Sequence, residues 1–428
     1  LFSDIGIGPS LIQNERQDPA FVNTAWTMQV VRGLAIWVIA CALAVPLAAF
    51  YQAEQLAWLL PIVSATALLA GFNSTKLFTL NRDLDVRRIT LSMVIAQAAG
   101  LAAMVAWALF DRSVLSLVAG VLVTSVTRMV LSHTYLPGAR NHLTWEPAAA
   151  QELVRFGRWI FISTLLTFLA GQADRVILGR LLSLDRLGVY YIAGVIAMIP
   201  SEALGRLSTQ IIFPLYSRAW ERDRRLGEGF ETVRRPLVLL AGWAFSGLIA
   251  GGPTAVDLLY DDRYQEAGWA VQLLAASGFV QVLGNTYGAA LWATGHSRAA
   301  AAASFAKVVG IAVLLPLGFY LGEAHAPGLG FPGAVLGFAV SELMRYLASA
   351  VACRSLVSTR AGSDTWMFLA VAVAGSAGAL LEWWLRVLEL HVVLRSLIIA
   401  VVVSLAWLPV GWPLIRERLA RRRARRAG

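Results

Sequence analysis

The segment Arg155–Arg180, with the sequence RFGRWIFISTLLTFLAGQADRVILGR, decides the fold class. Residues 159–169 are apolar or carry hydroxyl groups, and none of them is charged. Asp174 and Arg175 then appear together, just before the apolar residues resume at Val176. Charges inside a membrane span are rare and normally face other helices or a water-filled cavity. We therefore predict a membrane-crossing helix that directs this pair at a polar interior. The alternative is that the pair marks the helix end at the lipid headgroups.

The composition extends this prediction to the whole chain. Apolar residues make up 58% of the 428 residues, charged residues make up 14%, and the mean hydropathy is +0.65. A soluble protein of this size would carry far more charge. Runs of about 20 apolar residues recur, and each is long enough to cross the hydrocarbon layer as a helix. The sequence predicts an all-α polytopic membrane protein with about twelve transmembrane helices. The predicted spans are 26–50, 55–77, 89–110, 113–135, 157–179, 187–214, 236–258, 268–292, 299–321, 331–353, 366–387 and 392–414.

The arginines predict the orientation of the chain. One set of alternate loops, together with both ends of the chain, carries 22 arginines, and the opposite loops carry four. Cytoplasmic loops are the arginine-rich ones, so both ends of this multi-pass membrane protein are predicted to lie in the cytoplasm. The net charge of +10 is explained by these loops, and no nucleic-acid partner is expected. The basic tail 416–428 is typical of an anchor to anionic lipids.

The sequence shows no sign of an enzyme active site. Cys41 and Cys353 fall within apolar runs, and the five histidines are scattered along the chain. Neither set has the spacing of metal ligands, and no glycine-rich phosphate loop follows a strand. We therefore expect no cofactor, no metal site and no catalytic residue. An integral-membrane transferase stays a less favoured alternative, because it would need a large polar loop with clustered carboxylates or histidines.

A weak internal repeat predicts two lobes. Residues 26–88 and 236–298 each give two spans around a short outer loop, followed by a basic turn. The two segments start an even number of spans apart, so they point the same way, as in transporters built from parallel repeats. A central cavity between two pseudo-symmetric helical lobes is the expected arrangement. The predicted parts are an N-terminal lobe (1–135, truncated at its start), a cytoplasmic linker (136–156), a C-terminal lobe (157–358), an extra helix pair (359–415) and the basic tail (416–428).

Ten charges within the predicted spans are singled out as candidate functional groups, because the membrane would otherwise exclude such charges. Seven of these ten are cations and three are anions. They are Arg32, Lys76, Arg128, Arg175, Arg206, Lys307, Arg345, Asp174, Glu202 and Glu342.

Several of these charges have a structural alternative. Arg32 and Arg128 lie near helix ends, from which they can extend to the headgroups. Glu202 with Arg206, and Glu342 with Arg345, are spaced so that each pair shares a helix face and can neutralise itself. Lys307 lies in an alanine-rich span without a local partner, although another span could supply one.

The excess of cations predicts a cavity that attracts an anionic substrate. Arginine binds phosphate oxygens in a bidentate manner, and lysine acts as a point charge. The candidate substrate-binding residues are Arg32, Asp174, Arg175, Arg206, Lys307, Arg345 and Glu342.

Five motifs carry a family resemblance. They are LFSDIGIGPSLIQ (1–13), NTAWTMQVVRG (23–33), RFGRW (155–159), QADRVILGRLLSLDRLGVYY (172–191) and IIFPLYSR (211–218). The chain resembles the polysaccharide-transport branch, which is Wzx-like and colanic-acid-exporter-like, of the multidrug/oligosaccharidyl-lipid/polysaccharide (MOP) flippase superfamily. The resemblance implies fourteen helices in two six-helix lobes plus a terminal pair. The first two helices are then expected upstream of this sequence, apart from the remnant LFSDIGIGPS.

The resemblance also implies a function. It is that of a flippase that moves a polyprenyl-diphosphate-linked oligosaccharide across the inner membrane by alternating access, for exopolysaccharide, capsule or O-antigen synthesis. The expected partners are this lipid-linked oligosaccharide and the bilayer, with H⁺ or Na⁺ as candidate coupling ions and polysaccharide polymerase or export proteins as further candidates. The alternative is a cation-coupled multidrug antiporter of the same superfamily, whose site should be rich in buried carboxylates.

Overall fold

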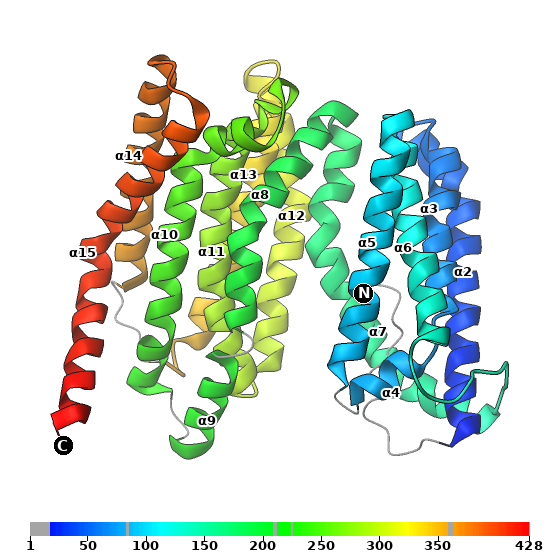
Figure 1. Ribbon diagram of the computed structural model, residues 1–428. Helices are drawn as coiled ribbons and strands as arrows, with labels where there is room; N and C mark the ends of the chain where they lie inside the picture. Colours follow the sequence, from blue (N-terminus) through cyan, green and yellow to red (C-terminus); the bar gives the residue numbers. More distant parts are fainter. Residues whose placement is uncertain (1–17, 83–84, 209–211, 224–225, 358–362, 428) are drawn as a thin grey trace. The chain divides into compact units, whose positions relative to one another are not determined.

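Every element in the described part of the chain is helical in the computed structural model of the protein (Figure 1). The structure describes residues 18–82, 85–208, 212–223, 226–357 and 363–427. The prediction of an all-α protein is confirmed. The elements are α2 (Pro19–Tyr51), α3 (Leu56–Gly71), α4 (Lys76–Arg82), α5 (Val86–Phe110), α6 (Val114–Thr134), α7 (Pro147–Leu181), α8 (Leu184–Leu207), α9 (Phe213–Asp223), α10 (Gly227–Leu259), η2 (Asp262–Tyr264), α11 (Ala267–Ala293), α12 (Ser297–His325), α13 (Gly330–Cys353), α14 (Ser363–Val387) and α15 (Val392–Ala427).

Short polar side chains set where several helices begin. The carboxylate of Asp18 accepts a hydrogen bond from the backbone N–H of Phe21 (3.2 Å), and Pro19 occupies the first helical position of α2. The hydroxyl of Ser183 caps α8 in the same way, by accepting from the backbone N–H of Arg186 (3.4 Å). Such caps satisfy backbone donors that have no partner within the helix, and proline loses nothing at the first position.

Ten helices in the described residues are long and apolar enough to cross a membrane. The predicted number of about twelve spans is not confirmed by this count and stays a prediction. One predicted span ends too late. For the predicted span 55–77, the helix α3 ends at Gly71 and has 16 residues. Apolar composition alone does not mark this end.

Polar groups end α3 early. The side-chain amide of Gln29 lies within hydrogen-bonding distance of the carbonyl oxygens of Ala70 (3.1 Å), Gly71 (3.1 Å) and Asn73 (3.0 Å). The last carbonyl groups of a helix have no partner within it, so a buried amide from α2 satisfies them. Gln29 is therefore a structural residue that fixes the end of α3 against α2.

The chain divides into two compact units, residues 1–169 and 170–428, and the division falls within α7. It lies later in the sequence than the predicted linker 136–156, whose last part already belongs to α7. In the first unit α2 packs on α3, and α5 packs on α6. Glycines allow both contacts, because a Cβ on Gly33 would meet the backbone of α3 and one on Gly100 would meet the side chain of Thr124.

In the second unit α11 is the central helix. Sixteen of its 27 residues are buried, and it packs against α8, α10 and α13. Figure 1 shows α14 and α15, in orange and red, beside the green α10, and both pack on that helix. A large cluster of buried apolar residues, including Phe245, Phe279 and Leu283, joins α10, α11, α14 and α15. These helices form the frame that holds the candidate site.

Backbone contact joins α12 to α13. A Cβ on Gly333 would meet the carbonyl oxygen of Gly318, and a Cβ on Gly337 would meet the carbonyl oxygen of Leu314. The missing side chains therefore bring the two backbones together. In membranes, where lipid is as apolar as leucine, such close packing is a main source of helix association.

We expect Gly333→Ala to destabilise the protein by about 1–3 kcal/mol, because the added methyl group forces two backbones apart. The matched control is Gly188→Ala on α8, where a Cβ meets nothing within 4 Å. That change should be neutral or stabilise the helix by about 0.5–1 kcal/mol. Thermal unfolding of the purified protein in detergent micelles measures both, and equal melting temperatures for the two variants would refute the close contact.

Candidate functional site

The carboxylate of Glu342, on α13, is the centre of a buried charge cluster. Its side chain is 1% exposed. Lys307 on α12 places Nζ 2.5 Å from Oε1, and Arg345 places Nε 3.1 Å from Oε2. The side-chain amide of Gln281 on α11 also donates to Oε1 (3.2 Å). One carboxylate thus connects three helices, and it satisfies two cations that the membrane would otherwise exclude.

The guanidinium of Arg345 also lies along α11. It donates to the side-chain oxygen of Asn285 (3.0 Å) and to the backbone carbonyl of Gln281 (3.1 Å). Gly284 makes room for it, since a Cβ there would lie 3.3 Å from a guanidinium nitrogen. With Glu342 as its third partner, Arg345 is held in one orientation. Its planar group is thus preorganised for a bidentate contact with a further anion.

Lys307, which has no local partner in the sequence, has an ionic partner in this cluster. On its own helix this lysine has no partner, as the sequence indicates, but α13 supplies one from 35 positions along the chain. Its ammonium group also lies 5.7 Å from the centre of the Phe338 ring. The predicted pairing of Glu342 with Arg345 is present as well. Two cations and one anion leave the cluster with a net charge of +1.

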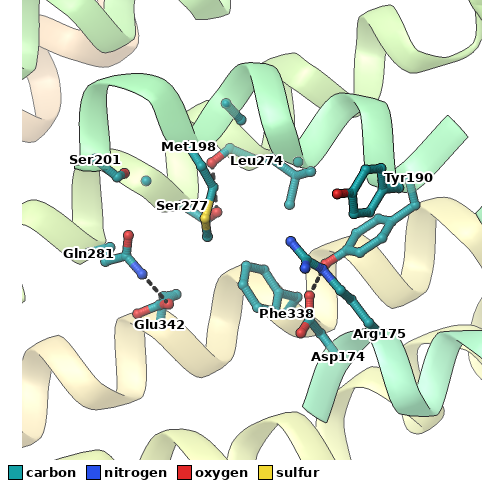
Figure 2. Close-up of a pocket in the computed structure, with 14 residues that line it drawn as sticks. Asp174, Arg175, Tyr190, Met198, Ser201, Leu274, Ser277, Gln281, Phe338 and Glu342 are labelled. Atoms are coloured by element: carbon teal, nitrogen blue, oxygen red, sulfur yellow. Dashed lines mark hydrogen bonds between the residues drawn. The ribbon is translucent and has the colours of Figure 1, made fainter. Parts of the chain in front are cut away.

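Asp174 and Arg175 lie beside a small cavity of about 30 Å³ in the second unit (Figure 2). Asp174 is 8% exposed, and the Tyr190 hydroxyl donates to its Oδ2 (2.6 Å). Arg175 donates to the side-chain oxygen of Gln172 (2.9 Å) and lies over the Tyr191 ring, 5.1 Å from its centre. The burial of Asp174 favours the predicted polar interior over a position at the headgroups.

The same small cavity reaches the charge cluster. Glu342 and Gln281 line it from the side opposite Asp174 in Figure 2. Its volume is about that of a single water molecule. The space is therefore too small for a lipid headgroup, and it separates two buried carboxylates that hold different partners.

A larger cavity of about 800 Å³ lies among α8, α11, α12 and α13. Its charged and polar lining residues are Glu202, Arg206, Ser208, Asn285, Arg345 and Ser349. Arg206 and Glu202 are exposed, whereas the side chain of Arg345 is 16% exposed. The cavity is within the size range of sites for small ligands. Two arginines and one glutamate give its lining a net charge of +1.

Missing side chains create part of this volume. Gly205 on α8 and Gly288 on α11 both line the cavity, and a Cβ on either would meet nothing within 4 Å. Ala289 and Ala300 add only methyl groups. These glycines differ from Gly333, which serves helix contact, because their open side faces the cavity.

The remaining predicted residues lie in the first unit. Arg32 is half-buried on α2. Arg128 is exposed on α6, as expected of a side chain near a helix end. Lys76 is buried and donates to the carbonyl oxygens of His133 (2.9 Å) and Leu136 (3.0 Å), which lie at the end of α6. A cation at a helix C-terminus is stabilised by the helix dipole, so Lys76 has a structural role.

A buried ion pair that the sequence analysis missed lies at the start of α10 and α14. Arg234 is 1% exposed, and its Nη2 lies 2.8 Å from Oδ1 of Asp364. The hydroxyls of Tyr287 (2.7 Å) and Tyr346 (2.8 Å) both donate to the other oxygen of Asp364. Arg234 also donates to the Thr286 hydroxyl (3.0 Å). The set joins α10, α11, α13 and α14.

A second missed cluster joins the other end of α10 to α14 and α15. Asp257 lies 2.8 Å from Arg386 and 3.0 Å from Arg395, and Glu382 lies 3.1 Å from Arg386. The Thr254 hydroxyl donates to Glu382 (2.9 Å). With equal numbers of cations and anions, the cluster is neutral. It attaches the last two helices to the frame, and neither missed cluster lines the cavities described above.

We expect Glu342→Gln to cost about 3 kcal/mol or more of stability, because it leaves two buried cations without their anion. Adding Lys307→Met should recover part of that loss, so the two changes should be non-additive. Chemical denaturation in micelles measures the coupling. The control is Arg263→Gln, which removes an ion pair whose partners are 79% and 52% exposed and should leave the midpoint unchanged. Additive effects of the two buried changes would contradict the cluster.

Comparison with known proteins adds family and fold. The sequence profile of the family described as "Polysaccharide biosynthesis protein" matches residues 1–268. The teichuronic acid biosynthesis protein TuaB of Bacillus subtilis is 22% identical over 69% of this chain and 61% of its own length. The lipopolysaccharide biosynthesis protein WzxC of Escherichia coli is 23% identical over 68% of this chain and 59% of its own length. The chain therefore spans about three-fifths of the length of these two relatives.

A solved structure shares the fold. The lipid II flippase MurJ, in an inward closed conformation, matches with a TM-score of 0.69 over 96% of this chain and 88% of its own length, at 10% identity. At this identity the likeness concerns the fold alone. The resemblance to the Wzx-like branch of the MOP flippase superfamily is confirmed by the family profile and these relatives. This multi-pass membrane protein belongs to the polysaccharide biosynthesis protein family.

Proposed function

We propose that this protein is a flippase that moves a polyprenyl-diphosphate-linked oligosaccharide from the cytoplasmic to the periplasmic leaflet of the bacterial inner membrane. The transported unit would serve exopolysaccharide, capsule or O-antigen synthesis. The family supports this proposal, as do the names of TuaB, WzxC and the succinoglycan biosynthesis transport protein ExoT of Rhizobium meliloti, which is 24% identical over 64% of this chain. The protein would act as a transporter and not as an enzyme.

The observation that carries the proposal is the large cavity with Arg206 and Arg345 in its lining. A diphosphate headgroup cannot cross hydrocarbon without replacement of its hydration. Two guanidinium groups on different helices can replace it with charge-assisted hydrogen bonds. The serines and Asn285 supply further partners for a polar headgroup, and the volume admits a phosphate with a sugar. The prenyl tail would stay in the lipid.

The remaining elements of the proposal rest on the sequence. Both chain ends would lie in the cytoplasm, as the arginine-rich loops indicate. Two lobes would alternate access to the cavity, with the predicted boundary at 136–156 and a further helix pair at 359–415. Arg32 would contribute a cation from the first lobe. H⁺ or Na⁺ would couple transport to an ion gradient, and polymerase or export proteins would receive the product.

The buried carboxylates of the described residues favour the flippase over the cation-coupled drug antiporter. Glu342 already has two cationic partners, and Asp174 accepts a hydrogen bond from Tyr190. A site for a cationic drug would present carboxylates that lack such partners. The cavity instead has an excess of positive charge.

We expect Arg206→Ala and Arg345→Ala each to reduce transport about tenfold or more, since each removes charge-assisted hydrogen bonds to phosphate. The measurement is polymer production in a flippase-null strain that carries the full-length gene, with membrane levels of each variant checked by immunoblot. Lysine at either position should restore activity in part, because it keeps the charge without the bidentate geometry. Full activity of both alanine variants would overturn the cavity assignment.

Filling the cavity gives an independent test. Gly205→Leu and Gly288→Leu place a side chain in open space, so they should block the substrate without disturbing neighbouring helices. Gly188→Leu is the matched control, because this glycine also lies on α8 with open space around it but does not line either cavity. We expect normal polymer from the control and a strong loss from the two blocked variants. Equal activity of all three would place the transport route elsewhere.

A further inference from the structure

Among the described residues that line the large cavity, Trp292 is the one with an aromatic side chain. It lies in the last turn of α11, lines the cavity and is 57% exposed. Among the described tryptophans, it is the one that lines either of the two cavities. Tryptophans near helix ends usually serve as interfacial anchors. The surroundings of Trp292 indicate a different role.

The surface of α11 beneath the ring of Trp292 carries no large side chain. Side chains in a helix lean towards its N-terminus, over the residues three and four positions before their own. For Trp292 these are Ala289 and Gly288, both in the cavity lining. A Cβ at Gly288 would meet nothing within 4 Å. Large neighbours on its own helix therefore do not cover the indole, and it borders open cavity volume.

Trp292 is also set at a defined distance from the anchored arginine. Asn285, which accepts from Arg345, lies seven residues before Trp292 on the same face of α11. Seven residues of helix span about 10 Å. This is comparable with the length of a diphosphate that carries one sugar ring. Arg345 can therefore hold a phosphate while the indole contacts the sugar attached to it.

Polar groups complete a sugar site around the ring. Glu202 lines the cavity one helical turn before Arg206, and its carboxylate accepts hydrogen bonds only. Ser304 on α12 and Ser349 on α13 add hydroxyls from the other walls. A pyranose has apolar C–H faces and a rim of hydroxyl donors. A flat indole with such acceptors nearby matches both parts of it.

We propose that Trp292 forms the platform for the phosphate-proximal sugar of the transported headgroup. Its indole would stack on the face of the ring while Arg345 and Arg206 hold the phosphates. The inference rests on the proposed flippase function and assigns a separate subsite within the same cavity. With this subsite, the affinity of the protein for its substrate depends on the first sugar as well as on the diphosphate.

The test compares two kinds of soluble probe on the purified full-length protein in lipid nanodiscs. One probe is farnesyl diphosphate, and the others are farnesyl diphosphates that carry N-acetylglucosamine, glucose or galactose. Dissociation constants are measured by isothermal titration calorimetry. For the wild type, at least one sugar should tighten binding about tenfold relative to farnesyl diphosphate, which is the gain expected from a stacked ring with its hydrogen bonds.

The variants separate sugar from phosphate. Trp292→Ala should abolish the gain that the sugar adds, and Trp292→Phe should keep most of it. Arg206→Ala should weaken all probes by a similar factor. The control Trp366→Ala, at the start of α14 and 61% exposed, should keep the full gain because this residue does not line the cavity.

Three outcomes overturn the inference, and one of them also reaches the proposed function. If Trp292→Ala keeps the sugar gain, the residue is an interfacial anchor. If the wild type binds farnesyl diphosphate but no sugar adds affinity, the subsite does not exist while the phosphate site stands. If the wild type binds none of the probes, the diphosphate site itself is refuted, and the proposed function fails with it.

Discussion

The second unit depends on the ion pairs that the buried carboxylate of Glu342 forms with two cations. This carboxylate lies between Lys307 and Arg345 and receives a hydrogen bond from Gln281, so it joins α11, α12 and α13 at one point. An isolated charge in this environment would be prohibitively costly, and the pairing is what allows three charged side chains within membrane helices. The same carboxylate borders the small cavity, while Arg345 borders the large one. The position of Arg345, the proposed phosphate-binding residue of the large cavity, is thus set by its ion pair with Glu342, which does not line that cavity.

The fold class could be predicted from the sequence because apolar runs of span length are sufficient to specify membrane helices. The pairing of charges could be predicted only within a helix. Glu342 and Arg345 are three residues apart, and the helical repeat makes such neighbours visible. Lys307 pairs with Glu342 from another helix, and the spacing of residues within one helix cannot predict such a contact. Arg234 and Asp364 were missed for a related reason. Both lie just outside the apolar runs 236–258 and 366–387. The helices α10 and α14 begin earlier than these runs, and Arg234, seven residues after the start of α10, pairs with Asp364 in the first turn of α14.

The cavity could not be predicted because part of its volume is created by side chains that its lining residues lack. Gly288 and Gly333 are indistinguishable in an apolar helical sequence. A Cβ on Gly333 would meet the backbone of a neighbouring helix, whereas a Cβ on Gly288 would enter open space. One glycine therefore closes a helix pair, and the other leaves volume for a ligand. The role of a small residue depends on which helix faces it, and the tertiary structure determines that neighbour. The same limit applies to Trp292, whose place at a helix end is also typical of an interfacial anchor.

The balance of charge bears on how a transporter can bind and still release. Among the ten span charges singled out from the sequence, the cations outnumber the anions by seven to three, which suggests a strongly positive interior. In the second unit much of this excess is cancelled. Lys307, Arg206 and Arg345 lie with Glu202 and Glu342 in and next to the large cavity, and together these five groups carry a net charge of +1. Two guanidinium groups with no carboxylate nearby would hold a diphosphate tightly and impede its release, whereas transport requires binding that is strong enough to admit the substrate and weak enough to free it. Glu342 serves both needs, because it fixes the orientation of Arg345 before the substrate arrives and lowers the positive potential that the substrate must leave.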